Sequence, residues 1–239
     1  MKLKHWVRFL LQQDTTWQGQ FAALKPLLLG DRDVEPFVVD VGANDGFYNS
    51  NSYPFIARGW KALLVEPNPD AFERVRQLHR HRVQVTLINV ACSDRGGELN
   101  LTIFADDDGG SHSRLGTPQP ARGTVDALAS SSVVPVKVFR LETLLDGECA
   151  PRNFGLLSID TEGHDYQVLL GANLSRYKPQ VIITENTPED EAKFALLRRH
   201  GYALYAALPY DSVWSRTGDL GGGLGHVGGF DLEGTPGRV

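Results

Sequence analysis

The sequence predicts an α/β fold whose sheet is mostly parallel, doubly wound and closed by an antiparallel hairpin. From Pro36 onward, short apolar segments alternate with amphipathic segments of helical periodicity, a pattern typical of parallel strands joined by helices. A glycine-containing turn follows the first apolar segment, and Pro209 separates two short strand-like runs near the end. A chain of 239 residues with 41% apolar residues can bury one full core. We therefore expect a single main domain.

The elements of this domain are expected over residues 35–217. Strands are predicted over 37–41, 61–66, 83–91, 154–160 and 180–185, and the closing hairpin joins 202–208 to 212–216. Helices are predicted from Gly46 to Gly59, from Pro69 to Arg80 with Asn68 as N-cap, and over 164–170 and 188–200. A sheet-edge strand over 98–104, a strand over 136–139 and a helix over 141–145 complete the prediction.

The segments outside these elements have their own expected roles. Residues 1–34 read as an amphipathic helical cap, interrupted near 14–16, that packs on the main domain. A dimerisation helix, which would make the protein a homo-oligomer, and a lid are the alternatives. The polar stretch 105–132 is expected to be a functional loop whose Ser111, His112 and Ser113 meet the ligand. Residues 218–239 read as a mobile, Gly-rich tail.

Composition restricts the classes of partner. A formal net charge of −5 argues against a nucleic-acid partner, which is usually met by a basic surface. The two cysteines, Cys92 and Cys149, form neither a disulfide framework nor a CxxC metal motif and suit a cytoplasmic location. No segment reads as a signal peptide or has the length of a membrane span. A small molecule is the expected partner.

Candidate cofactor-binding residues follow the first two strands. Asp40, Gly42, Ala43, Asn44 and Gly46 form the first strand end and its turn, where glycines allow close approach of a ligand to the backbone. Glu66 ends the second strand, about 20 residues after the turn, which is the position of a carboxylate that accepts both ribose hydroxyls. This spacing predicts a nucleoside-binding unit.

Two cofactor classes fit that unit. A dinucleotide site requires the phosphate-cradling pattern G-x-G-x-x-G, whereas this turn reads G-x-N-x-G and places a side chain where a pyrophosphate needs bare backbone. S-adenosylmethionine has a ribose, an adenine and an amino-acid end but no phosphate, so it fits the turn better. A nicotinamide-linked sugar oxidoreductase and a non-catalytic nucleoside-binding module remain the alternatives.

Four motifs together resemble the FkbM family of methyltransferases. They are Val-Asp-Val-Gly-Ala-Asn-Asp-Gly at 39–46, Glu-Pro-Asn at 66–68, Asn-Val-Ala-Cys-Ser-Asp at 89–94 and Ser-Ile-Asp-Thr-Glu-Gly-His at 158–164. The resemblance covers about residues 37–216. It implies a Rossmann-like class I methyltransferase fold, S-adenosylmethionine as cofactor, and methyl transfer to a hydroxyl of a sugar or of a glycosylated or polyketide natural product.

The third strand end is expected to border the adenine. Ala91 and Cys92 would supply a flat apolar contact, and Asp94 or a backbone amide would bond the exocyclic amine. A small buried hydrophobe is the alternative role for Cys92. Asp160, at the fourth strand end, is expected to contribute to the cofactor site as well.

Polar residues at the fourth and fifth strand ends are the candidates for the chemistry. Asp160, Glu185 and Asn186 converge if their strands are neighbours, and such oxygen ligands suit magnesium. In the alternative, Glu162 and Glu185 cap helices or bind substrate hydroxyls directly. His164 has the pKa range of a general base, and Glu162 is the catalytic carboxylate expected beside it.

Overall fold

The computed structural model describes residues 14–16, 19–30, 33–105, 111–115, 131–187 and 190–219. The described ranges leave out residues 1–13 of the predicted N-terminal cap and most of the polar stretch 105–132. They also leave out nearly all of the Gly-rich tail 218–239. No helix within the described ranges is long and apolar enough to span a membrane.

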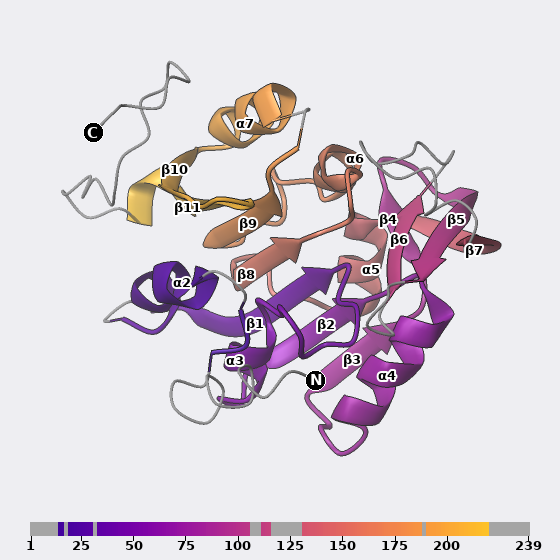
Figure 1. The fold of residues 1–239 in the computed structure, drawn as a ribbon. Helices are drawn as coiled ribbons and strands as arrows, with labels where there is room; N and C mark the ends of the chain where they lie inside the picture. Colours follow the sequence, from indigo (N-terminus) through magenta and orange to yellow (C-terminus); the bar gives the residue numbers. More distant parts are fainter. Residues whose placement is uncertain are drawn as a thin grey trace, which may run out of the picture.

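The main sheet has seven strands in the order β10-β11-β9-β8-β1-β2-β3 (Figure 1). All are parallel except β11, which runs antiparallel to both of its neighbours. Their bounds are β1 Glu35–Val41, β2 Lys61–Val65, β3 Val85–Ile88, β8 Phe154–Ile159, β9 Val181–Glu185, β10 Tyr202–Ala207 and β11 Asp211–Arg216. The predicted mostly parallel sheet and its terminal antiparallel hairpin are confirmed.

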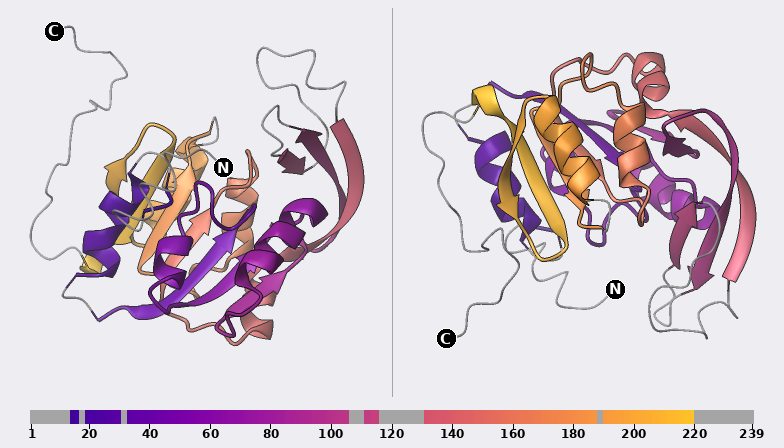
Figure 2. Two further views of the ribbon diagram at one scale, coloured as in Figure 1. Left: turned by 60° about the horizontal axis from the view of Figure 1, so that its bottom comes forward. Right: turned by 90° about the horizontal axis from the view of Figure 1, so that it is seen from above.

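Helices cover both faces of this sheet, as a doubly wound fold requires (Figure 2). One face packs against α2 Gln20–Leu28, α3 Tyr53–Ile56 and α4 Pro69–His79. The other packs against α5 Leu141–Gly147, α6 Asp165–Gly171 and α7 Asp190–Arg199. A short 3-10 helix, η2 Thr217–Asp219, follows the last strand. Because α2 buries Phe21, Leu24 and Leu27 against the sheet, its apolar face belongs to the core.

A second sheet lies beside the first and corrects three predictions. It has four strands in the order β4-β7-β5-β6, with bounds β4 Ala91–Ser93, β5 Gly97–Ala105, β6 Ser111–Leu115 and β7 Ser131–Arg140. The predicted strand over 83–91 is therefore two strands in different sheets. The strand predicted at a sheet edge lies between β7 and β6, and part of the predicted loop 105–132 is β6. These strands form because β5 and β7 pair over their length and bury an apolar cluster around Leu101 and Val138.

Local hydrogen bonds explain where two helices begin. The predicted helix cap is confirmed, because Asn68 Oδ1 accepts from the amides of Asp70 and Ala71 at 3.0 and 3.5 Å. The prediction of a helix from Gly46 to Gly59 is wrong over most of this range, because α3 covers only Tyr53–Ile56. Asp45 Oδ1 instead accepts from the amides of Phe47 and Tyr48, and the backbone stays irregular up to α3.

Two glycines at helix ends differ in role. Gly201 follows α7 with φ 82°, so it is a left-handed helix terminator. Gly171 is the last residue of α6, and the reason for a glycine there is packing. A Cβ at this position would lie 2.0 Å from the carbonyl oxygen of Ser93, so only glycine lets α6 approach β4 this closely.

Candidate active site

Acidic side chains occupy the same edge of five adjacent strands. In sheet order β2, β1, β8, β9 and β11, they are Glu66, Asp40, Asp160, Glu185 and Asp211. The first four lie at or directly after the carboxyl ends of parallel strands. Asp211 begins β11, whose antiparallel direction brings its first residue to the same edge, opposite Glu185. We call these five residues the carboxylate row.

Strand alternation places the row on one face of the sheet. Leu64, Val38, Leu156, Ile183 and Val213 all belong to the apolar cluster under α2, α3 and α4. Each member of the row lies an even number of positions from one of these residues, so its side chain is directed to the same face. The five acidic residues of the row therefore share one edge and one face of the main sheet.

The turn after β1 is shaped by glycine. Gly42 has φ 88°, and its amide donates to Val65 O at 2.9 Å, which holds the turn against the end of β2. A Cβ on Gly42 would lie 1.8 Å from the carbonyl oxygen of Asp160. Gly46 has φ 75°, and a Cβ there would lie 2.5 Å from Val75 of α4. The predicted turn thus brings bare backbone between the ends of β1, β2 and β8.

Glu66 is held beside this turn. Its carboxylate accepts from the amide of Asn44 at 2.7 Å and from the amide of Asn68 at 2.9 Å. Asn89 donates to the Glu66 carbonyl oxygen at 2.7 Å, which ties the end of β2 to the segment after β3. Only 4% of Glu66 is exposed, and this burial raises its pKa to about 7. A buried carboxylate with lone pairs left over suits hydroxyl donors.

Asp40 is the centre of a small hydroxyl network. Its Oδ2 accepts a short hydrogen bond from Ser52 Oγ, and the carboxylate also accepts a hydrogen bond from the Ser158 hydroxyl. Asn51 Nδ2 lies 3.4 Å from Ser158 Oγ. Burial raises the pKa of Asp40 to about 6, against the lowering effect of these hydroxyls. In this structure, Asp40 therefore bonds the hydroxyl of Ser52, in the loop before α3, and that of Ser158 in β8.

The segment predicted to border the adenine is β4 with its neighbours. Ala91 and Cys92 are both buried, Ala91 in the core of the second sheet and Cys92 in the core of the main sheet. Burial raises the pKa of the Cys92 thiol to about 12. This environment fits the alternative role of Cys92 as a small apolar side chain.

Mutual repulsion is strongest where β8 and β9 end. Burial, then the carboxylates of Glu162 and Asp165, raise the pKa of Glu185 to about 7, although Lys193 opposes this shift. Desolvation by the surrounding protein and the charges of Glu162 and Glu185 raise the pKa of Asp160 well above its ordinary value. Because Asp160 as a whole residue is exposed, solvent screens part of this effect. Cationic ligands or hydroxyl donors would relieve this accumulation of charge.

The residues at this point do not fit the predicted magnesium site. Among the described residues, no group of three or more His, Cys, Asp and Glu side chains is arranged to hold a metal ion. Asn186 Nδ2 donates to Leu208 O at 3.0 Å, and its backbone amide donates to Tyr210 O at 2.8 Å. Asn186 therefore anchors the β10–β11 hairpin.

His164 directly precedes α6 and contacts β4. Its Nε2 lies 2.9 Å from Ser93 Oγ, and Ser93 Oγ donates to Asp94 Oδ1 at 3.0 Å. A serine hydroxyl has one hydrogen, so the contact with His164 requires the ring hydrogen to be on Nε2. In the neutral ring, Nδ1 is then the basic atom. Glu162 lies two residues before His164 and has φ 54°, an uncommon backbone conformation for a residue with a side chain.

The second sheet reaches the site through β6. Arg114 Nη2 lies 4.0 Å from Glu162 Oε2, with both side chains partly exposed. Of the three residues predicted to meet the ligand, Ser113 is the neighbour of Arg114 on β6, whereas the side chains of Ser111 and His112 lie outside the described part of the chain.

Sequence reasoning missed Asp211 and its partner Gln20. Gln20 Nε2 donates to Asp211 Oδ2 at 2.6 Å, so α2 contacts the carboxylate row directly. Burial raises the pKa of Asp211. The predicted hairpin contained the necessary signal for Asp211, because an antiparallel last strand has to begin at the edge where the parallel strands end.

The Gly42 turn can be tested by its stability. Gly42→Ala should destabilise the protein by more than the roughly 1–2 kcal/mol of left-handed strain alone, because its Cβ would also meet the Asp160 carbonyl. Gly59→Ala is the matched control, since Gly59 has φ 90° and a Cβ there would meet nothing within 4 Å. Urea unfolding of both variants measures the difference. Equal losses would contradict the close approach of β8 to the turn.

Comparison with solved structures finds similar folds at low identity. A methyltransferase FkbM from Methylobacillus flagellatus KT aligns with TM-score 0.48 and 14% identity, covering 78% of this chain and 45% of that one. An rRNA methylase from Streptococcus thermophilus aligns with TM-score 0.44 and 13% identity, covering 82% and 93%. The chain thus spans less than half the length of the first of these proteins. No curated protein matches the sequence significantly.

The sequence itself provides the decisive comparison. Residues 40–204 match the family described as the methyltransferase FkbM domain. The matched region begins at Asp40 in the first strand and includes the glycine turn, Glu66, β4, and the ends of β8 and β9. Gln20 and Asp211 lie outside it. The chain therefore belongs to the FkbM methyltransferase domain family.

Proposed function

We propose that this protein transfers a methyl group from S-adenosylmethionine to a hydroxyl of a small polar molecule, such as a sugar or a glycosylated or polyketide natural product. The observation that carries the proposal is the carboxylate row, which lies beside the Gly42 turn in a chain of the FkbM family. Ligands of open parallel sheets bind at this edge.

The residues present fit S-adenosylmethionine. Glu66 would accept both ribose hydroxyls, and the Gly42–Gly46 turn, which packs closely against Asp160 and Val75, would present its backbone to the cofactor. Asp160, surrounded by other acids, favours the cationic part of the cofactor, because a positive charge relieves the repulsion that raises its pKa. When bound, S-adenosylmethionine supplies an electrophilic methyl group on a sulfonium.

The acceptor end of the row lies away from Glu66, around Glu185 and Asp211. Carboxylates accept hydrogen bonds from hydroxyls and repel phosphate and carboxylate groups. A polyhydroxylated acceptor without an anionic group near the reacting hydroxyl is therefore the best match. The remaining requirement is loss of the hydroxyl proton as the carbon–oxygen bond forms. We assign the removal of this proton to Nδ1 of His164, with Glu162 as the catalytic carboxylate nearby.

The two alternative functions fit the carboxylate row less well. A nicotinamide dinucleotide would bring its phosphates towards Asp40 and Asp160, and the side chain of Asn44 occupies the turn that a pyrophosphate needs. A non-catalytic binding module would keep the nucleoside pocket but would have no use for acids beyond Asp160. Both alternatives are therefore less consistent with the carboxylate row than methyl transfer is.

Calorimetry should show binding of S-adenosylmethionine and no measurable binding of NAD at the same concentrations. Incubation with methyl-labelled cofactor and a panel of sugars and hydroxylated natural products should then yield a labelled ether. Binding of NAD alone would replace the proposal by the oxidoreductase. Cofactor binding without any labelled product across the panel would favour the binding module.

A further inference from the structure

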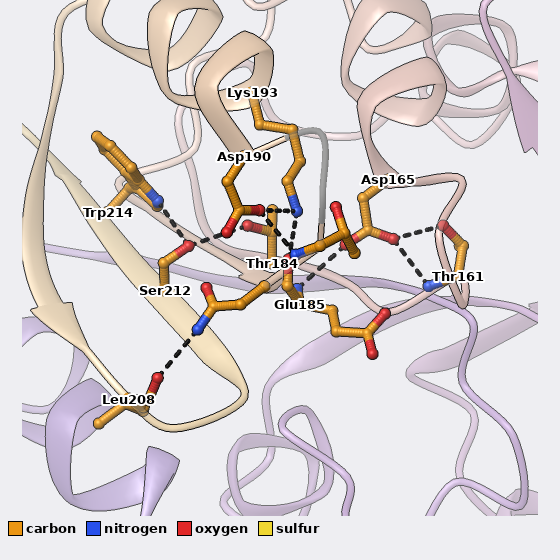
Figure 3. A network of polar contacts seen from close by, with 11 residues as sticks. Thr161, Asp165, Thr184, Glu185, Asp190, Lys193, Leu208, Ser212 and Trp214 are labelled. Atoms are coloured by element: carbon orange, nitrogen blue, oxygen red, sulfur yellow. Dashed lines mark hydrogen bonds and ion pairs between the residues drawn. The ribbon is translucent and has the colours of Figure 1, made fainter. Parts of the chain in front are cut away.

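Lys193 of α7 is fully buried, although its side chain ends in an amino group. Figure 3 shows this group among its polar partners. The amino group donates a short hydrogen bond to the backbone carbonyl of Glu185 and lies 3.0 Å from Asp190 Oδ1. Burying an ammonium group is costly unless it is paired and hydrogen-bonded, and an apolar side chain would fill the same space without that cost. The position therefore calls for an explanation beyond packing.

The contacts of Lys193 converge on the Glu185 peptide. While Lys193 holds the carbonyl of Glu185, Asp165 Oδ2 accepts from the amide of the same residue at 3.1 Å. Asp165 is buried in α6, and Lys193 is buried in α7. Two helices thus hold the backbone of Glu185 by both of its polar groups, at the last residue of β9.

Asp165 extends this arrangement to the end of β8. Its Oδ1 accepts from the amide and hydroxyl of Thr161 at 2.9 and 2.6 Å. Thr161 follows Asp160 and precedes Glu162, so one buried carboxylate fixes the spacing between the β8 and β9 ends. Since the backbone of Glu185 is held on both sides, its half-buried side chain is left to project at the edge (Figure 3).

We propose that Lys193 is a positioning residue for methyl transfer, which acts with Asp165 by fixing the Glu185 peptide so that the Glu185 carboxylate can accept a hydrogen bond from the acceptor and orient its reacting hydroxyl. This inference rests on the proposed function. The positive charge of Lys193 supports the arrangement, because it also offsets repulsion among Asp165, Glu185 and Asp211.

A matched pair of variants separates this role from simple packing. Lys193→Met removes the donor, whereas Lys193→Gln, which matches methionine in length and is one bond shorter than lysine, keeps an N–H donor directed towards the Glu185 carbonyl. Lys193→Met should lower kcat/KM for the acceptor by about tenfold to 100-fold, as expected for a misplaced reactant, and leave the Kd of S-adenosylmethionine within about twofold. Lys193→Gln should recover much of this loss. Equal losses in both variants would overturn the positioning role.

A double-mutant cycle tests whether Lys193 acts through Glu185. In a Glu185→Ala background, Lys193→Met should change kcat/KM by less than about twofold, because the group that it positions is gone. If the double variant instead lost kcat/KM by the product of the two single-variant losses, Lys193 and Glu185 would act independently, and the inference would be overturned. Asp190→Asn, which keeps the acceptor Oδ1 beside Lys193, should retain most activity, and a loss as large as that of Lys193→Met would place the effect in the ion pair instead.

The outcomes stay interpretable if Lys193→Met does not fold, which circular dichroism would reveal. Asp165→Asn then takes its place, since its amide can still accept from Thr161 but can no longer accept from the Glu185 amide. It should show the same loss and the same non-additivity with Glu185→Ala. Failure of the wild-type protein to methylate any acceptor would instead contradict the proposed function, so the two failures are distinguishable.

Discussion

Replacing His164 by alanine should lower kcat by about 10²–10⁴, the contribution of a positioned general base, and leave the Kd of S-adenosylmethionine nearly unchanged. The expectation follows from the hydrogen-bond chain that runs from His164 through Ser93 to Asp94. This chain places the ring hydrogen on Nε2, so Nδ1 is the atom that we propose as the proton acceptor. Single-turnover methyl transfer at saturating acceptor and cofactor measures the change in the chemical step.

Two control variants separate the base from its surroundings. His164→Gln keeps a donor near the position of Nε2, and with it the link to Ser93, but has no basic atom, so it should be as slow as the alanine variant. Ser93→Ala keeps the ring and removes its orientation, and a smaller loss is expected. If His164→Gln retained the wild-type rate, the base assignment would be wrong, and Glu162 would be the next residue to test.

Strand ends were predictable because two local signals agree there. Each buried strand of a parallel sheet reads as a continuous apolar run, and a polar residue at its end marks the edge where ligands bind. Asp40, Glu66, Asp160 and Glu185 were found in this way. The cap at Asn68 was predictable for the same reason, since it depends on amides only two and three residues away.

The second sheet was not predictable from local signals. The pairing of Gly97 with Val138 joins residues far apart in the sequence, and the intervening segment is polar and rich in glycine. Such a segment reads as a loop until a partner strand is known. Arg114 was missed for the same reason, since only the pairing of β6 with β5 brings it towards Glu162.

The magnesium hypothesis shows a different limit of sequence reasoning. Sequence patterns place Asp160, Glu185 and Asn186 at or after the ends of their strands, but a metal site also depends on where each side chain points. Asn186 uses its amide to hold the hairpin, and Lys193, which the sequence shows only as one more helical lysine, occupies the interior behind Glu185. Side-chain partners of this kind arise from tertiary packing and leave no local pattern.

Glu66→Ala should weaken binding of S-adenosylmethionine by about 1.5–3 kcal/mol, the range for hydrogen bonds to a charged group. The ribose hydroxyls would lose their acceptor, and the amides of Asn44 and Asn68 would lose theirs. Glu66→Gln keeps the shape and one acceptor oxygen, so a smaller loss is expected. An unchanged Kd in Glu66→Ala would contradict the ribose assignment, whatever its effect on turnover.

The same residue predicts how cofactor binding depends on pH. Because burial raises the pKa of Glu66 to about 7, the ligand-free protein holds a proton on this carboxyl below that pH. In the proposed site the ribose hydroxyls bind the Glu66 carboxylate, so the proton competes with the cofactor, and affinity that is present above pH 7 is lost as the pH falls. The Kd should rise by up to about tenfold per pH unit below the pKa. Asp40, with a pKa of about 6, adds a second loss at lower pH.

Calorimetric titrations at pH 8, 7 and 6 isolate the Glu66 contribution by comparison with Glu66→Gln, in which the dependence between pH 8 and 7 should disappear. An identical pH dependence in both proteins would show that another group takes up the proton.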